Sequence, residues 1–184
     1  MSVPTQTPSS WPELPYAAWA DTCTTLHLWT QVVGKVRLAK SPWVNHSWHV
    51  TLYVTARGLT TSLIPHGERQ FQVDFDFIDH RLLVSVSDGQ RRTLPLAPMS
   101  VADFHEKLMG MLGELDIPVR IRELPNEVPD PIPFSQDQVH ASYDAQYANQ
   151  YCGGCCCRRT ASSRRSGPAS PASAVRCTSS GAAT

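Results

Sequence analysis

The feature that most constrains the fold is a strict alternation of apolar and polar residues on both sides of a short polar turn. Apolar side chains occupy every second position before the turn and again after it, at Phe71, Val73, Phe75, Phe77, Leu82, Val84 and Val86. A period of two is typical of a β-strand with one buried face. Two such runs around Asp79-His80 predict an antiparallel hairpin. The expected pairs, all on one face, are Phe77 with Leu82, Phe75 with Val84 and Val73 with Val86.

Further strands are expected on either side of this hairpin. Residues 48–54 also alternate, and residues 59–64 make a short strand before a turn at 65–67. After Val86, a three-residue loop around Asp88-Gly89 places Val84 opposite Leu94 and Leu82 opposite Leu96, which keeps charge off the buried face. A last short strand is expected around Val119 and Ile121. These runs predict an antiparallel meander of four or five strands.

Two helices are expected to cover the meander. The first runs from about residue 15 to residue 39 and carries an apolar stripe with steps of three and four residues, made of Trp19, Cys23, Leu26, Trp29, Val33 and Val36. Ser100 is a good N-cap for the second helix, whose stripe is Val101, Phe104, Leu108, Met111, Leu112 and Leu115. The fold class is therefore α+β, with the long amino-terminal helix and the second helix on one face of the sheet.

Composition divides the chain into four parts. Residues 1–10 form a polar, disordered leader, and residues 11–124 form the α+β domain. Residues 125–151 are a proline-rich connector followed by the start of a third helix, and residues 152–184 form a disordered tail. The zero net charge of the whole chain is a sum of unlike pieces. Residues 1–151 hold 11 basic and 16 acidic residues, whereas the tail holds five arginines and no acid.

The tail follows the third helix without a cap or a linker, which predicts a change of reading frame near Cys152. If each codon's third base is joined to the first two bases of the next, Cys155-Cys156-Cys157 must yield two leucines. With GC-rich codons the regrouped stretch reads RRVLLQADRVFKEFR, an amphipathic helix that continues from Tyr151. The alternative is a native disordered tail.

Four blocks of this sequence resemble a bacterial family catalogued as domain of unknown function 5996. They are WPELPYAAWADTCTTLHLWTQVVGKVRL, PWVNHSWHVTLYVTARGLTTSLIP, FDFIDHRL and PDPIPF followed by HASYD. The resemblance covers roughly residues 11–151 and implies no activity, cofactor or catalytic residue. It also implies a natural chain that continues beyond this point, so that the present chain is a truncated product.

The strongest candidates for chemistry lie at the entrance of the strand predicted for residues 48–54. His46 and His49 could form a metal or acid–base site if the chain bends between them, with His140 and Asp144 of the third helix completing it. The competing interpretation is ordinary polar packing at a strand edge, because residues three apart on an extended strand face opposite sides. No metal ligand set is assigned, and the cofactor is unknown.

Four further residues are candidates for ligand binding. Trp43 and Trp48 lie near element ends, Arg57 stands at a strand end, and Tyr143 belongs to the face of the third helix. Two functions stay open: a small-molecule enzyme with its site around His46 and His49, or a non-catalytic ligand-binding or protein-interaction module that uses the polar face of the sheet and these tryptophans. Whether the protein is an enzyme is undecided.

Composition also bears on partners and location. No run approaches the 18 apolar residues of a membrane-spanning helix, and the amino terminus lacks the pattern of a secretory signal. We therefore expect a cytoplasmic protein with no membrane partner. A specific nucleic-acid partner is not expected, since the only basic segment is the tail. An unknown small molecule stays open as a partner, and the sequence does not determine the oligomeric state.

Overall fold

The predicted amino-terminal helix is present as α1 (Tyr16–Lys40). The computed structural model describes residues 14–152, apart from the side chains of His46 and Trp48. The leader and the tail predicted at the two ends of the chain lie outside the described residues. Helix α1 begins directly after Pro15, which needs no hydrogen-bond partner at a helix start. It ends at Ser41, whose backbone is extended because Pro42 follows.

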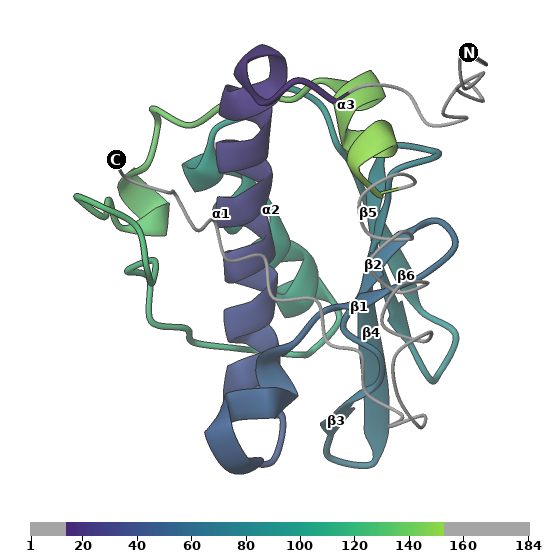
Figure 1. The fold of residues 1–184 in the computed structure, drawn as a ribbon. Helices are drawn as coiled ribbons and strands as arrows, with labels where there is room; N and C mark the ends of the chain where they lie inside the picture. Colours follow the sequence, from purple (N-terminus) through teal and green to yellow (C-terminus); the bar gives the residue numbers. More distant parts are fainter. Residues whose placement is uncertain (1–13, 153–184) are drawn as a thin grey trace, which may run out of the picture.

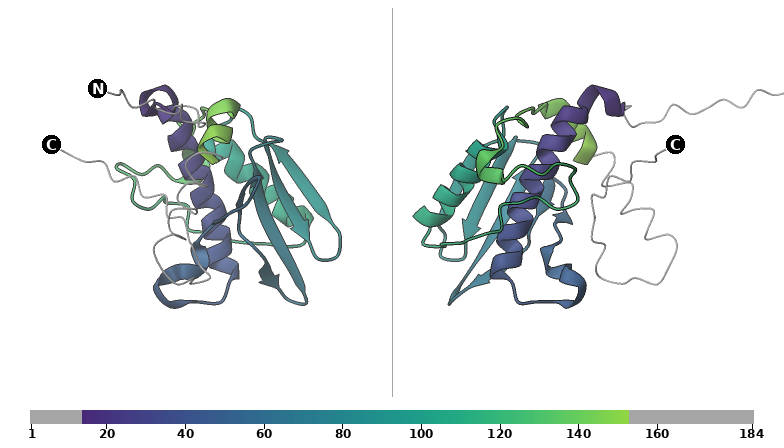
Figure 2. Two further views of the ribbon diagram at one scale, coloured as in Figure 1. Left: turned by 45° about the vertical axis from the view of Figure 1, so that its right-hand side comes forward. Right: turned by 90° about the vertical axis from the view of Figure 1, so that its left-hand side faces the viewer.

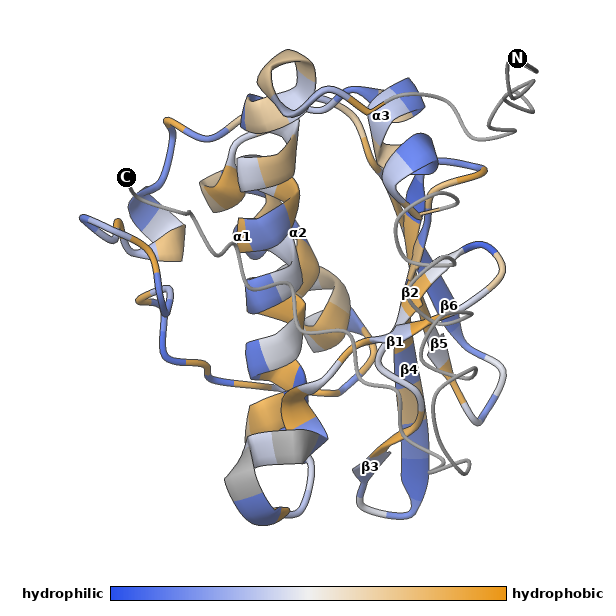
Figure 3. Cartoon of the chain, in the orientation of Figure 1, coloured by the Kyte–Doolittle hydropathy of each residue, from blue (hydrophilic) through white to orange (hydrophobic). Residues whose placement is uncertain are grey.

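Helix α1 is buried on two sides, whereas the sequence indicated a single apolar stripe. One side faces the sheet together with α2 (Val101–Glu114). The connector after α2 passes around the opposite side of α1 (Figures 1 and 2) and includes the short 3-10 helix η2 (Phe134–Gln136), before α3 (Ala145–Gln150) ends the described chain. The side of α1 that faces the connector carries polar residues such as Gln31 and Lys35, which bond to the connector. Hydrophilic bands therefore interrupt the hydrophobic ones along α1 (Figure 3).

The predicted α+β class is confirmed, with an antiparallel sheet beneath the two helices. Its strands are β1 (Tyr53–Val54), β2 (Gly58–Thr60), β3 (Ile64–His66), β4 (Arg69–Asp76), β5 (Arg81–Val86) and β6 (Arg91–Pro95). Their order is β1-β2-β4-β5-β6, and β3 also pairs with β4. Both helices lie on one face of this sheet, and the described residues place no helix on its other face (Figures 1 and 2).

The central hairpin exists, but its predicted register is wrong by two residues. Phe75 pairs with Leu82 and Val73 with Val84, so the loop spans residues 77–80 rather than two residues. The cause is Asp76, whose carboxylate accepts hydrogen bonds from the backbone N–H groups of Ile78 and Asp79. A shift by two keeps every apolar side chain on the buried face, so alternation alone cannot distinguish the two registers.

The second hairpin register is wrong in the same way. The loop has the expected three residues, 87–89, because the backbone N–H of Val86 donates to the carbonyl of Gln90. Leu82 consequently pairs with Leu94, and Val84 pairs with Arg92. Arg92 reaches the end of α2 and forms an ion pair with Glu114, N–O 2.9 Å. The register predicted from the sequence placed no charge on this face. Arg92 instead lies at the margin of the face, where Glu114 neutralises it.

The strand expected over residues 48–54 is wrong for most of its length. Residues Asn45–Val50 form a 3-10 helix, η1, and only Tyr53–Val54 is extended and paired. Ser47 has a positive φ of 56°, which breaks an extended chain, and its N–H donates to the carbonyl of Val44. The apolar Val50 instead packs on α1 at Gly34.

Two other strand predictions need correction. The strand expected at 59–64 is interrupted, because Ser62 has a φ of 54° and Thr61 uses its hydroxyl to accept from the N–H of Val73. The strand expected around Val119 and Ile121 is absent, since this segment runs along α1 and not along the sheet. Lys35 of α1 donates to the carbonyl of Leu124, 2.8 Å, and so holds the segment there.

The core lies between the sheet and the two helices. Trp29 of α1 is fully buried and stacks on Phe104 of α2, with ring centroids 4.8 Å apart. Phe104 in turn stacks on Phe75 of β4. Large buried rings of this kind contribute much of the apolar burial that stabilises a domain of this size.

Candidate functional site

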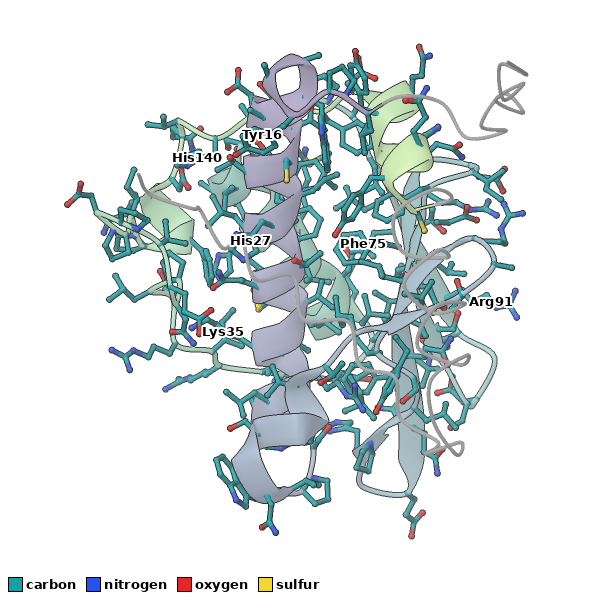
Figure 4. All side chains as sticks on the ribbon, in the orientation of Figure 1. Tyr16, His27, Lys35, Phe75, Arg91 and His140 are labelled. Carbon is teal, nitrogen blue, oxygen red and sulfur yellow. The ribbon has the colours of Figure 1, made fainter. Side chains whose placement is uncertain are left out.

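The structure distributes the predicted site residues between the two ends of α1. At the first end, the N–H of Asp144 donates to the hydroxyl of Thr22, and His140 lies beside the start of α2. At the other end, Val50 of η1 packs on Gly34. Twelve helical residues separate Thr22 from Gly34, which corresponds to about 18 Å. His140 and Asp144 therefore do not meet His49, and the four-residue site predicted from the sequence is not assembled. Figure 4 shows His140 beside the first turns of α1.

The residues at the first end have local partners. His140 Nδ1 lies 2.8 Å from Asp137 Oδ2, and the same carboxylate accepts from the backbone of Val139 and His140. Asp144 is the N-cap of α3, because its carboxylate accepts from the N–H of Tyr147. These bonds explain both side chains as structural, since capping of this kind fixes a helix start.

Tyr143 links α3 to the central hairpin. Its ring is buried against Trp29, and its hydroxyl lies 2.8 Å from His80 Nδ1. Burial, with a smaller contribution from the charge of Asp144, raises the pKa of Tyr143, so the phenol stays protonated. The hydrogen bond between this phenol and His80 fixes the hairpin loop, in which His80 has a φ of 49°.

Arg57 belongs to an ion-pair network at the same end of the sheet. Its guanidinium contacts Asp76 at 2.8 Å and Asp79 at 2.7 Å, and Arg81 contacts Asp79 at 2.8 Å. Burial raises the pKa of Asp76, but hydrogen bonds from the N–H groups of the loop and from Arg57 outweigh it, so the net pKa is lowered. Two cations neutralise two carboxylates, which leaves little charge for a ligand.

The polar side chains of α1 that face the connector also have partners within the fold. Figure 4 shows His27 and Lys35 on the side of the helix that faces the connector. Lys35 donates to the carbonyl of Leu124 and lies 5.7 Å from the centre of the Phe134 ring. Burial and, to a lesser degree, the charge of Arg122 lower the pKa of Lys35. Gln31 exchanges two hydrogen bonds with the backbone of Asn126, so these side chains attach the connector to α1.

The opposite end of α1 holds a charge that the fold does not neutralise. Arg37 is only 7% exposed, and within residues 14–152 no carboxylate forms an ion pair with it. One terminal nitrogen donates to the carbonyl of Thr51, and the guanidinium lies over the Tyr53 ring, 5.0 Å from its centre. Its Nε is buried, and no acceptor for it lies in the part of the chain that the structure describes. Sequence reasoning missed Arg37, although its place four residues after the buried Val33 was the available signal.

His49 lies two residues before the carbonyl that Arg37 binds. It is 5% exposed, and its Nδ1 accepts a hydrogen bond from the backbone of Val44 at 3.2 Å. The other ring nitrogen, Nε2, is buried without a partner among the described residues. The Trp43 ring meets the His49 ring edge to face, with centroids 5.2 Å apart. We call Arg37, Trp43, His49, Thr51 and Tyr53 the α1–η1 corner. The side chains of the other two candidates here, His46 and Trp48, lie outside the described residues.

Residues 14–152 contain no group of three or more His, Cys, Asp or Glu side chains placed to hold a metal ion. None of the helices in that range combines the length and the apolar character needed to cross a membrane.

The fold and the corner define an α+β domain with an antiparallel sheet, a two-helix cover and a buried arginine that no carboxylate within residues 14–152 neutralises. Residues 11–159 match the model of a family of unknown function (DUF5996), and the chain belongs to that family. A search of curated proteins and a search of solved structures each found no match.

Proposed function

We propose that this domain is a binding module for a small anionic molecule, held at the α1–η1 corner around His49. The observation that carries the proposal is the burial of the Arg37 guanidinium without a carboxylate among the described residues. Transferring a charged group from water into a protein costs several kcal/mol unless a partner compensates it. An anion bound beside Arg37 and His49 would supply that partner.

The protein itself compensates only part of this cost. Arg37 lies in the last turn of α1, where the carbonyl end of the helix dipole favours a positive charge. The Thr51 carbonyl and the Tyr53 ring add one hydrogen bond and one cation–π contact. Two buried donors, Arg37 Nε and His49 Nε2, still lack acceptors among the described residues. Donors without acceptors favour a ligand rich in oxygen over a purely apolar one.

Binding is favoured over catalysis because the acid–base partners predicted for His49 lie elsewhere. His140 and Asp144 are at the far end of α1, and Nδ1 of His49 is already engaged with Val44. A general base needs a free lone pair within hydrogen-bond reach of the reacting group. The enzyme hypothesis for the strand entrance is therefore the weaker of the two.

Thermal unfolding with simple anions tests the proposal. Sodium acetate and sodium phosphate, compared with sodium chloride at equal ionic strength, should raise the Tm of the chain in a saturable manner, because a ligand that binds only the folded state stabilises it. Arg37→Met should abolish the increase. Arg120→Met, which removes an exposed arginine from the connector, is the matched control and should retain it. Equal shifts in all three proteins would refute binding at the corner.

The open face of the sheet supports a second candidate function, protein interaction. A shallow depression of about 390 Å³ lies on it, lined by polar side chains around Leu63 and Leu83. Leu63, which is 60% exposed, adds an apolar side chain at the margin of this depression. Leu83→Asp should weaken the binding of any protein partner copurified with the chain without changing the anion response.

We further propose that the frame changes near Cys152, which rests on the abrupt change of composition and on the amphipathic stretch that regrouped codons give. Sequencing the locus tests this, since an intact upstream frame without a slip would exclude it. A bacterial source and a cytoplasmic location stay predictions of the sequence.

A further inference from the structure

Three exposed apolar side chains belong to the α1–η1 corner or lie next to its residues in the chain. Trp43 is 70% exposed, and Val44 and Leu38 are 46% and 39% exposed. All three belong to the last turns of α1 or to its connection with η1. Isolated exposed apolar residues are ordinary, but a tryptophan with most of its surface in water is a common anchor for ligands and partners.

The exposed ring and the unpartnered donor are physically joined. Trp43 meets His49 edge to face at an interplanar angle of 62°, and the neighbouring residue Val44 donates its N–H to His49 Nδ1. A molecule that accepts a hydrogen bond from His49 Nε2 therefore binds to the ring on which Trp43 packs. The two kinds of surface, apolar and hydrogen-bonding, belong to one site.

Hydrogen bonding at His49 also fixes the charge of the site. Because Nδ1 accepts from Val44, the ring hydrogen is on Nε2 and the imidazole is a neutral donor. The buried side chains of the corner then carry one positive charge, that of Arg37. A ligand with a single negative charge neutralises it, whereas a dianion such as phosphate would leave one buried charge uncompensated.

We propose that the ligand of the α1–η1 corner is a small aromatic monocarboxylate. Its two carboxylate oxygens accept from Arg37 Nε and His49 Nε2, and its ring packs on Trp43. This inference rests on the proposed anion-binding function and adds the class of ligand. Charge complementarity selects the carboxylate, and the exposed indole selects the aromatic group.

Calorimetric titration of the full chain with acetate, phenylacetate and inorganic phosphate tests the ligand class. Phenylacetate should bind about tenfold more tightly than acetate, the size expected for one aromatic contact, and more tightly than phosphate. Trp43→Ala should reduce the preference for phenylacetate to about twofold or less, whereas Trp43→Tyr should retain most of it. Leu63→Ala removes another exposed apolar side chain, 60% exposed on the open sheet face, and should change nothing.

The outcomes distinguish the proposed ligand class from the anion-binding function on which it rests. If acetate and phenylacetate bind equally and both require Arg37, the ligand class is wrong and the anion-binding function stands. Tighter binding of phosphate than of phenylacetate would overturn the monocarboxylate in the same way. If none of the three anions binds the folded chain, both proposals fail, and solvent satisfies the two buried donors.

Discussion

Arg57 and Arg37 differ in exposure and in ion pairing. The more exposed arginine, Arg57, has carboxylate partners, and the buried one, Arg37, has none among the described residues. Arg57 has a half-exposed side chain and contacts two carboxylates, Asp76 and Asp79, within 2.8 Å. Arg37 is buried and has no carboxylate among the described residues. An exposed charge needs no partner and a buried charge does. The Arg57 network is therefore explained by its role in holding the hairpin loop and β2 together. Arg37, in contrast, needs an anionic partner that the described residues do not supply.

The largest difference in stability between the two regions is expected when alanine replaces the glycine in each, Gly58 near Arg57 and Gly34 near Arg37. A Cβ at Gly58, next to Arg57, would lie 1.8 Å from the carbonyl oxygen of Phe75 in the neighbouring strand, so Gly58→Ala must displace β2 from β4. We expect a loss of about 3 kcal/mol in the free energy of unfolding, as for severe overpacking. Urea denaturation measures it.

Gly34, in the helix that carries Arg37, is the matched control. A Cβ there meets only Val50 at an ordinary 3.5 Å, and Gly34 lies inside α1, near its carboxy-terminal end. Gly34→Ala should stabilise the domain by about 0.5–1 kcal/mol, because alanine favours a helix more than glycine does. If both substitutions destabilise by the same amount, the corner is packed as tightly as the contact between β2 and β4, and room for a ligand is excluded.

The next effect tests how far the Arg57 network depends on its buried carboxylate. Asp76→Asn removes the charge that Arg57 and Arg81 share and weakens the bonds that hold the hairpin loop. We expect a loss of about 2 kcal/mol in urea denaturation, the usual cost of losing a charged hydrogen-bond acceptor. Asp74→Asn should cost less than about 0.5 kcal/mol, since Asp74 bonds only Gln72 on the open face.

The same two regions show what the sequence could predict. The stripes of α1 and α2, the cap at Ser100 and the alternation of β4 and β5 reflect periodic burial, and they predicted the element types correctly. The hairpin registers failed because shifts by two residues leave the alternation unchanged, and a single side chain, Asp76, decides between them. Residue spacing could not place His49 and His140 at opposite ends of one helix, because that depends on the path of a long connector.

A pH titration sharpens the role of Asp76. Because hydrogen bonds lower its pKa in the folded state, the folded protein binds fewer protons than the unfolded one, and this contribution is fully present above about pH 4. It is lost as the pH falls through the lowered folded-state pKa. Stability of the wild type should therefore fall more steeply below pH 4 than that of Asp76→Asn. Parallel acid limbs for the two proteins would show that the carboxylate is not held in its charged form.

The smallest effect is expected at Arg37 itself, and its smallness is diagnostic. Arg37→Met removes the donor to the Thr51 carbonyl, which costs about 1 kcal/mol, but it also removes a buried charge with no ion-pair partner, which offsets much of that loss. Urea denaturation without ligand should show a net change within about 1 kcal/mol in either direction. A loss above about 2 kcal/mol would make Arg37 a structural link between α1 and β1. A near-neutral substitution that also removes the response to phenylacetate would assign the buried charge to binding, because a residue kept for stability cannot be replaced at so little cost.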